Sequence, residues 1–114
     1  MIGAAFYARV FNGVAAANQG LYQAGKFKKA FDYRNFADSL SAARGFTTYW
    51  DATAQAPYAY SPARQEFASF DDEKSIRLKT RYARDKHLGG IMFWELTGDK
   101  PQHGLLDAMY QAAR

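Results

Sequence analysis

The chain has 114 residues and a formal net charge of +4, and 17% of its residues are aromatic and 23% are charged. This length and composition allow one hydrophobic core and argue against a disordered segment. The absence of cysteine excludes disulfides, thiolate catalysis and Cys-ligated metal sites.

An apolar run from Ile2 to Tyr7 opens the sequence and predicts a strand that is buried on both faces, as in a parallel sheet. Such a strand needs a neighbour, and the sequence offers none before it, so we expect the chain to be part of a larger protein. Residues 10–30 contain several glycines and predict a loop. Apolar residues at helical spacing predict a helix over 31–43, with Gly45 as its stop.

Three β-prone stretches follow, over residues 46–50, 58–60 and 66–70. Residues 51–57 read as a turn or loop between the first two stretches, and a proline turn follows the second. Together the stretches predict a small antiparallel meander that is packed by aromatic residues.

A helix is predicted over residues 73–87, because either Asp71 or Asp72 can accept backbone N–H groups at its start. Gly89 is the predicted left-handed residue after the helix. Basic residues punctuate this helix, with Glu73 and Asp85 nearby, and we interpret them as a solvated face. A nucleic-acid-binding surface would concentrate basic residues on one side, so we expect no nucleic-acid partner.

A second two-sided apolar strand is predicted over residues 90–96, and a final helix over 104–113. A helix that crosses to such a strand has the length of one βα repeat. We therefore expect strands 2–7 and 90–96 to be parallel neighbours. A complete eight-unit barrel takes about 250 residues. The predicted fold is α+β: a partial (β/α) barrel of two parallel βα units that carries a small antiparallel α+β insertion domain.

Five blocks of the sequence, in this order, resemble the C-terminal segment of bacterial family-18 chitinases. The blocks are Ile2–Arg9, Asp32–Arg34, Tyr49–Tyr58, Phe70–Ile76 and Leu88–Glu95. They are similar, in turn, to the seventh barrel strand, the start of the inserted domain, its Pro-Tyr hairpin, the start of the seventh helix, and the eighth strand. One departure is Ala8, which stands where the family usually has glycine.

By this resemblance the chain divides into three parts. Residues 1–9 would form barrel strand 7, residues 10–70 the α+β insertion domain, and residues 71–114 helix 7, strand 8 and helix 8. It also implies that the whole enzyme hydrolyses chitin by a substrate-assisted retaining mechanism, in which the acetamide of the sugar attacks the anomeric carbon.

The family's catalytic motif, Asp-x-x-Asp-x-Asp-x-Glu, is absent from this sequence, since none of its 11 carboxylates has that spacing. The Met-x-Tyr-Asp motif of the sixth strand is absent as well. We therefore expect no catalytic residue in this chain and no turnover by the chain alone.

The resemblance implies six substrate-binding residues: Trp94, Tyr7, Arg9, Tyr33, Arg34 and Gln55. Trp94 would end the last strand, at the face where barrel sites are built. Its indole offers a flat apolar surface to a sugar ring and one N–H donor. The alternatives are structural: a core aromatic for Trp94, a packed aromatic for Tyr7 and a salt bridge for Arg9.

Other polar residues are interpreted as structural. Asp71 and Asp72 suit a helix start, where they complement the helix dipole. Glu95 is predicted to point away from Trp94, because neighbours in a strand face opposite sides. His87 and His103 are separated and have no cluster of ligands, so we expect neither a metal site nor a cofactor.

The expected partners are chitin or N-acetylglucosamine oligomers, with no nucleic acid and no membrane. A homo-oligomer is also expected, because exposed barrel-strand edges invite pairing. The first residues lack a basic leader and a long apolar run, so no signal peptide is predicted in this chain. The resemblance implies a secreted parent, extracellular or periplasmic. The alternative functions are a stand-alone carbohydrate-binding module and an interaction domain without turnover.

Overall fold

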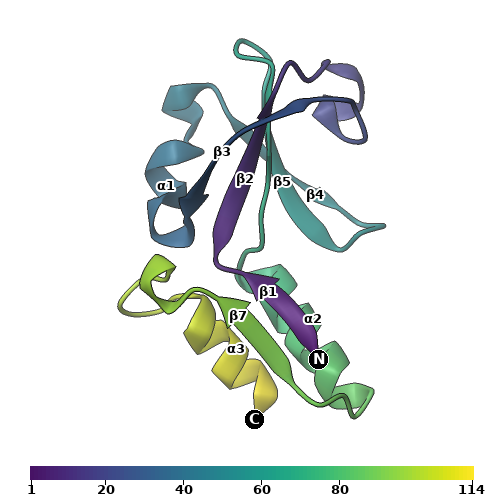
Figure 1. The fold of residues 1–114 in the computed structure, drawn as a ribbon, viewed down its shortest axis with the longest axis vertical. Helices are drawn as coiled ribbons and strands as arrows, with labels where there is room; N and C mark the ends of the chain where they lie inside the picture. Colours follow the sequence, from purple (N-terminus) through teal and green to yellow (C-terminus); the bar gives the residue numbers. More distant parts are fainter.

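Two sheets organise the fold in the computed structural model, which describes residues 1–114 (Figure 1). The first is a parallel pair of β1 (Ile2–Ala5) and β7 (Ile91–Trp94). The second is an antiparallel sheet of five strands in the order β3-β2-β6-β5-β4. The predicted α+β class, with one small antiparallel sheet and one parallel sheet, is confirmed.

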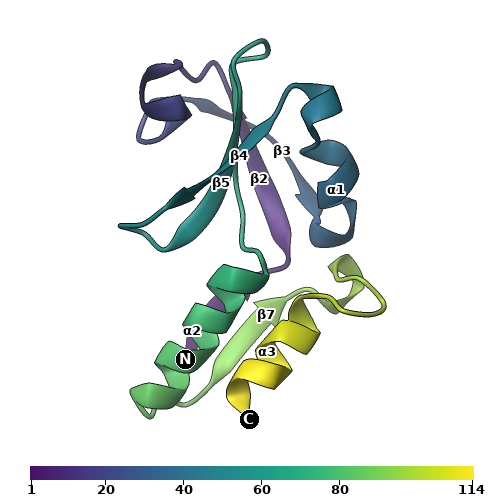
Figure 2. The same cartoon turned by 180° about the vertical axis from the view of Figure 1, so that it is seen from behind.

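The parallel pair joins the two ends of the chain. Its register runs from Ile2 opposite Ile91 to Ala5 opposite Trp94, as the βα spacing predicted. Two helices, α2 (Glu73–Asp85) and α3 (Leu105–Ala113), pack side by side against one face of this pair (Figure 2).

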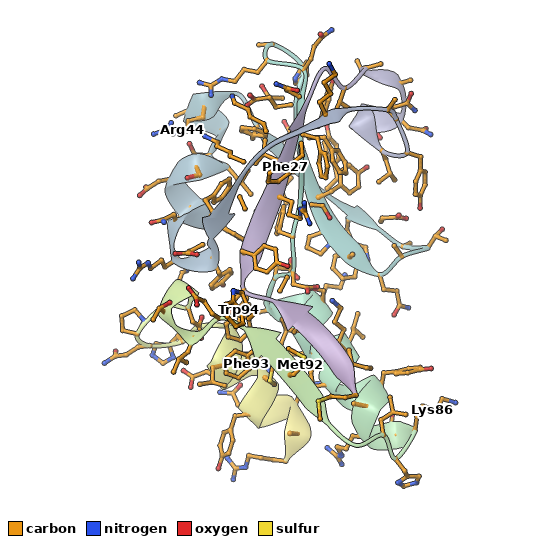
Figure 3. The ribbon with its side chains drawn as sticks, in the orientation of Figure 1. Phe27, Arg44, Lys86, Met92, Phe93 and Trp94 are labelled. Atoms are coloured by element: carbon orange, nitrogen blue, oxygen red, sulfur yellow. The ribbon has the colours of Figure 1, made fainter.

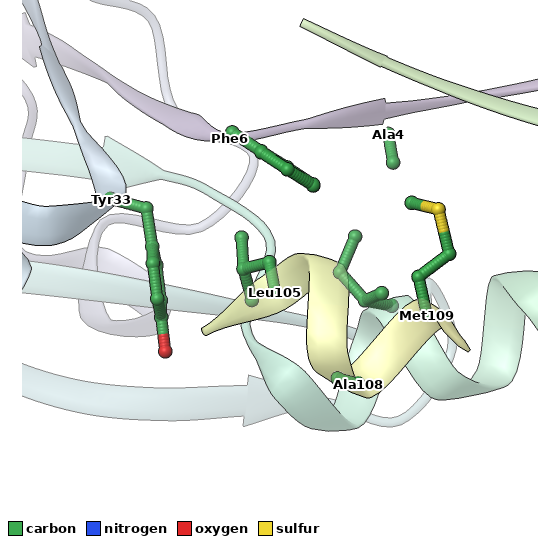
Figure 4. Close-up of a cluster of buried hydrophobic side chains, with 7 residues drawn as sticks. Ala4, Phe6, Tyr33, Leu105, Ala108 and Met109 are labelled. Carbon is green, nitrogen blue, oxygen red and sulfur yellow. The ribbon is translucent and has the colours of Figure 1, made fainter. Parts of the chain in front are cut away.

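Apolar side chains fill the space between the parallel pair and the helices (Figure 4). Phe6, Ile76 and Leu105 are fully buried there. The ring of Phe6 stacks on that of Phe93, with the centroids 4.6 Å apart. This core fixes the end of β7, and with it the position of Trp94.

The opening apolar run forms two strands, and its prediction as one strand was wrong. The chain bends at Phe6, and β2 (Tyr7–Asn12) leaves for the antiparallel sheet. Phe6 anchors the bend, because its N–H donates to the Trp94 carbonyl and its carbonyl accepts from the Tyr33 N–H. A continuous apolar run carries no sign of a change of sheet. The predicted burial of this run on both faces was also wrong, since Gly3 is exposed and Ile2 and Ala5 are only partly buried.

The predicted loop over 10–30 was also wrong, because it contains most of β2 and much of β3 (Lys26–Asp32). These strands pair antiparallel, with a register shift between Val10 and Phe11. β3 is an edge strand whose first five residues are exposed, three of them lysines. Lysines on an edge strand discourage pairing with other chains, and they also remove the apolar alternation by which a strand is predicted.

The helix predicted over 31–43 is reduced to the single turn of α1 (Phe36–Ser39). It lies between the 3-10 turns η2 (Tyr33–Asn35) and η3 (Ala42–Arg44). Asparagine, aspartate and serine favour caps and turns over helix interiors. Gly45 ends the segment with φ 85°, as predicted.

The predicted meander is confirmed as β4 (Thr47–Asp51), β5 (Ala56–Ser61) and β6 (Glu66–Ser69). Aromatic rings link its strands: Tyr49 stacks on Tyr58, which stacks on Phe67. The turn is narrower than predicted, so that Pro57 lies within β5.

Helix α2 begins as predicted, with a capping box in which Asp72 accepts from the Ser75 N–H and the Ser75 hydroxyl accepts from the Asp72 N–H. Its end differs from the prediction. The helix stops at Asp85, and His87 rather than Gly89 adopts the left-handed conformation, with φ 54°. The last turn, η4 (Leu96–Gly98), connects β7 to α3. No helix in the chain has the length and apolar character needed to cross a membrane.

Candidate substrate-binding site

A cavity of about 330 Å³ lies where the two sheets meet. Its lining residues come from three elements and their ends: Tyr7, Ala30, Phe31, Asp32, Trp94 and Glu95. Tyr7 begins β2 and Asp32 ends β3, and the two are cross-strand partners. Trp94 ends β7. The bend at Phe6 therefore brings together residues that are far apart in the sequence.

Trp94 is 63% exposed, although the residue before it is packed in the core. Alternation along β7 explains the difference, since Ile91 and Phe93 face the helices while Met92 and Trp94 face solvent (Figure 3). The structure thus rules out the alternative of a core aromatic at Trp94. An exposed indole presents a flat apolar surface with a single polar N–H.

Asp32 supplies a carboxylate to the cavity wall. One oxygen lies 3.8 Å from the guanidinium of Arg34, and both side chains are partly exposed. The chain passes close beside it, because a Cβ at Gly98 would lie only 3.2 Å from the other oxygen. In the sequence analysis Asp32 entered only as the first residue of the Asp32–Arg34 block, which resembles the start of the family's inserted domain. Its pairing with Tyr7 depends on a long-range register that the sequence alone does not reveal.

Glu95 also lines the cavity, beside Trp94. Glu95 was predicted to point away from Trp94 by strand alternation, but β7 ends at Trp94, so that alternation does not extend to Glu95. The Glu95 carboxylate accepts a hydrogen bond from the Thr97 hydroxyl at 2.9 Å. The cavity lining therefore combines three aromatic residues with two carboxylates.

Two of the predicted residues, Arg9 and Arg34, lie at the margin of the cavity. Arg9 lines a neighbouring cavity of about 310 Å³, whose wall also includes Tyr7. Its guanidinium lies over the ring of Phe27, 4.7 Å from the centroid. Arg34 is exposed and reaches the cavity only through its contact with Asp32.

Two further predicted residues lie away from the cavity. Tyr33 is 7% exposed and packs edge-on against Phe36 in the core. Burial, followed by the nearby carboxylates Glu73, Asp99 and Asp72, raises the pKa of Tyr33 to about 12. Gln55 is exposed in the β4–β5 turn. Of the six predicted residues the structure brings Tyr7 and Trp94 into the cavity, and sugar contact by the others stays a prediction.

The acidic pair before α2 has structural partners, as predicted. Asp72 caps the helix, and the Asp71 carboxylate accepts from the Ala5 N–H, the Ser75 hydroxyl and the Lys79 ammonium. No three His, Cys, Asp or Glu side chains gather closely enough to hold a metal ion.

Comparison with known proteins identifies the family. Residues 1–99 match the sequence model described as glycosyl hydrolases family 18. The chain belongs to this family. It is 38% identical over 108 residues to chitinase A1 of Niallia circulans, a match that includes 88% of this chain.

Solved structures of family 18 agree with this assignment. A family-18 N-acetylglucosaminidase from Paenibacillus barengoltzii superposes with a TM-score of 0.84 at 42% identity, over 98% of this chain. A class V chitinase variant from Nicotiana tobaccum, solved in complex with NAG4, superposes with a TM-score of 0.82 at 26% identity, over 97% of this chain. The chain spans 33% of each of these structures and 16% of chitinase A1.

Proposed function

We propose that this chain supplies one wall and part of the floor of the substrate groove of a chitinase. In this proposal β1 and β7 are the seventh and eighth strands of a (β/α) barrel, and residues 10–70 are the insertion domain beside them. The observation that carries the proposal is the exposed indole of Trp94 at the end of β7, in one cavity with Tyr7, Asp32 and Glu95.

The chemistry of these side chains suits a β-1,4-linked N-acetylglucosamine chain. A pyranose ring has an apolar C–H face, which can stack on the indole, and an equatorial rim of hydroxyl and acetamide groups. The Tyr7 hydroxyl can donate or accept, and the carboxylates of Asp32 and Glu95 can accept from sugar hydroxyls. Binding sites for small molecules typically combine apolar and aromatic walls with a few such polar groups.

The bond-breaking step is assigned to parts of the whole enzyme outside this sequence. Protonation of the glycosidic oxygen needs a carboxylic acid in the family's motif, and that motif is absent here. The proposed parent enzyme is secreted, because its substrate is an insoluble polymer that cannot enter a cell. The chain alone is expected to bind oligomers without cleaving them.

The unpaired edges of β1 and β7 affect the oligomeric state expected for the isolated chain. β1 and β7 pair only with each other, so each strand has one unpaired edge. We expect a second copy to cover these strand edges in solution. A concentration-independent monomer in sedimentation velocity would contradict this expectation.

Calorimetric titration with N-acetylglucosamine oligomers tests the proposed function. The wild-type chain should bind, and Trp94→Ala should weaken binding by about tenfold or more, as for the loss of a central aromatic contact. Tyr110→Ala is the matched control, because Tyr110 is an exposed aromatic on α3 that does not line the cavity. Equal binding by wild type and Trp94→Ala would refute the proposal. Turnover of the oligomers by this chain would refute the assignment of the acid to another segment.

A further inference from the structure

Asn12 is the only asparagine or aspartate of this chain that is followed by glycine. It is the last residue of β2, at the end of the antiparallel sheet that lies far from the parallel pair (Figure 1). Asn12 and Gly13 are both exposed, and a Cβ at Gly13 would meet nothing within 4 Å. The peptide group between these two residues is therefore uncrowded and open to solvent.

The polar groups on both sides of this peptide have no partner in the protein. The Gly13 N–H donates to no backbone carbonyl. None of the side-chain hydrogen bonds of the chain involves Asn12 or Gly13. Asn12 and Lys26 form the last pair of the β2–β3 ladder, so Gly13 lies outside it. The Gly13 nitrogen has no hydrogen bond to give up and its residue has no side chain, so it can approach the side-chain carbonyl of Asn12.

The two other asparagines of the chain differ at this point. The N–H of the residue after Asn18 donates to the Ala16 carbonyl at 3.1 Å. The N–H of the residue after Asn35 donates to the Tyr33 carbonyl. In both cases the backbone nitrogen would have to leave a hydrogen bond before it could react, and the residue that carries it has a side chain that crowds the approach. Asn12 alone is followed by a free and unhindered N–H.

We propose that Asn12 is a site of spontaneous deamidation in the folded chain. The Gly13 amide nitrogen gives up its proton to hydroxide and attacks the side-chain carbonyl carbon of Asn12, and the bond from that carbon to Nδ2 breaks. The departing nitrogen takes a proton from water and leaves as ammonia, which restores the hydroxide and leaves a five-membered succinimide ring. Water then adds to either ring carbonyl and opens the ring to aspartate or to isoaspartate. The whole sequence consumes one water, releases one ammonia and involves no oxidation or reduction.

Both products change the end of the β2–β3 ribbon. Each adds one negative charge to a chain whose formal net charge is +4. In the aspartate product the new carboxylate is on the residue opposite Lys26, which takes part in none of the ion pairs of the chain, and opposite charges at facing positions attract. In the isoaspartate product the main chain runs through the former side-chain carbon and is one atom longer. The pair of Asn12 with Lys26 should therefore open in this product.

Incubation of the folded full chain, followed by peptide mass spectrometry, tests this inference. Fragmentation spectra should assign the mass gain of an NH₂-to-OH exchange to Asn12, at a rate at least about tenfold above those of Asn18 and Asn35, because glycine leaves the attacking nitrogen unhindered. The rate should rise with pH, since the nitrogen must lose a proton before it attacks. Isoaspartate at this position, detected by enzymatic methylation, identifies the succinimide route, because direct hydrolysis of the side-chain amide yields aspartate alone.

Asn12→Gln is the matched control variant, because it keeps a side-chain amide at the same exposed position but would have to close a less favourable six-membered ring. It should stay unmodified over the period in which the wild-type chain converts. Gly13→Ala puts a methyl group in open space and should slow the conversion by about tenfold, with circular dichroism as the check that it folds. Equal rates at the three asparagines, aspartate without isoaspartate, or no conversion in the wild-type chain would each overturn the inference.

Discussion

Asp71 ties the start of α2 to the end of β1, and its removal should destabilise the chain more than removal of its neighbour Asp72. Asp71 is 4% exposed, and its carboxylate accepts from the Ala5 N–H at 3.1 Å, the Ser75 hydroxyl at 2.8 Å and the Lys79 ammonium at 2.6 Å. The Asp72 side chain accepts one bond, from the Ser75 N–H at 2.9 Å.

The expected magnitudes follow from these contacts. Removing one partner of a buried ion pair typically destabilises by about 3–5 kcal/mol. Lys79 is partly exposed, so water screens its end of the pair, and we take the lower limit, about 3 kcal/mol, for Asp71→Ala. Replacing an N-cap by alanine costs about 1 kcal/mol, which is the expectation for Asp72→Ala. Asp71→Asn keeps one acceptor oxygen and should lie between the two.

Urea denaturation at neutral pH measures these differences as shifts of the midpoint at constant slope. Hydrogen exchange of the Ala5 amide gives a local readout, because Asp71→Ala leaves that N–H without its acceptor. If Asp71→Ala destabilises no more than Asp72→Ala, the buried contacts of Asp71 do not hold β1 to α2, and this reasoning is wrong.

Two further predictions concern local geometry. His87→Gly should raise the free energy of unfolding by about 1 kcal/mol in thermal denaturation, because His87 has a left-handed φ of 54° that glycine adopts more easily. Gly89→Ala is the control and should change the free energy of unfolding little, because a Cβ at Gly89 meets nothing within 4 Å. A larger gain in stability from Gly89→Ala than from His87→Gly would contradict this reasoning. The Tyr22 hydroxyl donates to Asp51 and lowers the pKa of that carboxyl, so Tyr22→Phe should raise the pKa of Asp51 toward its ordinary value in an NMR titration. Because the pKa of Asp51 is lowered in the folded state, the stability that this group contributes is present above its unfolded-state pKa and is lost as pH falls through its folded-state pKa. Tyr22→Phe should therefore make the loss of stability between neutral and acid pH smaller.

The sequence predicted much of the region formed by the parallel pair of β1 and β7 and the helices packed on it. The apolar run at residues 91–94 and the helix before it have the spacing of a βα unit, which predicted the parallel pairing of β1 with β7. Side-chain chemistry predicted a helix cap at Asp71 or Asp72, and in the structure Asp72 is the cap. These features follow from patterns within short stretches of the sequence.

The remainder depends on long-range contacts that a local pattern does not encode. The turn into the second sheet at Phe6 occurs inside an unbroken apolar run, and β3 lacks alternation because its exposed edge carries lysines. Both errors hid the pairing of Tyr7 with Asp32, and so the carboxylate in the cavity was missed. Tyr33 was predicted at the site from the family resemblance; its ring packs in the core, and its contact with sugar stays a prediction.

The most direct test of the central claim uses the two indole N–H signals of the chain, from Trp50 and Trp94. Trp50 lies on β4, outside the cavity, and Lys74 sits over its ring, so it serves as an internal control. In a proton–nitrogen NMR titration with N-acetylglucosamine oligomers, the Trp94 indole signal should move in a saturable way while that of Trp50 stays fixed. An unchanged Trp94 signal at saturating oligomer would contradict the claim that this residue is the floor of a sugar-binding groove.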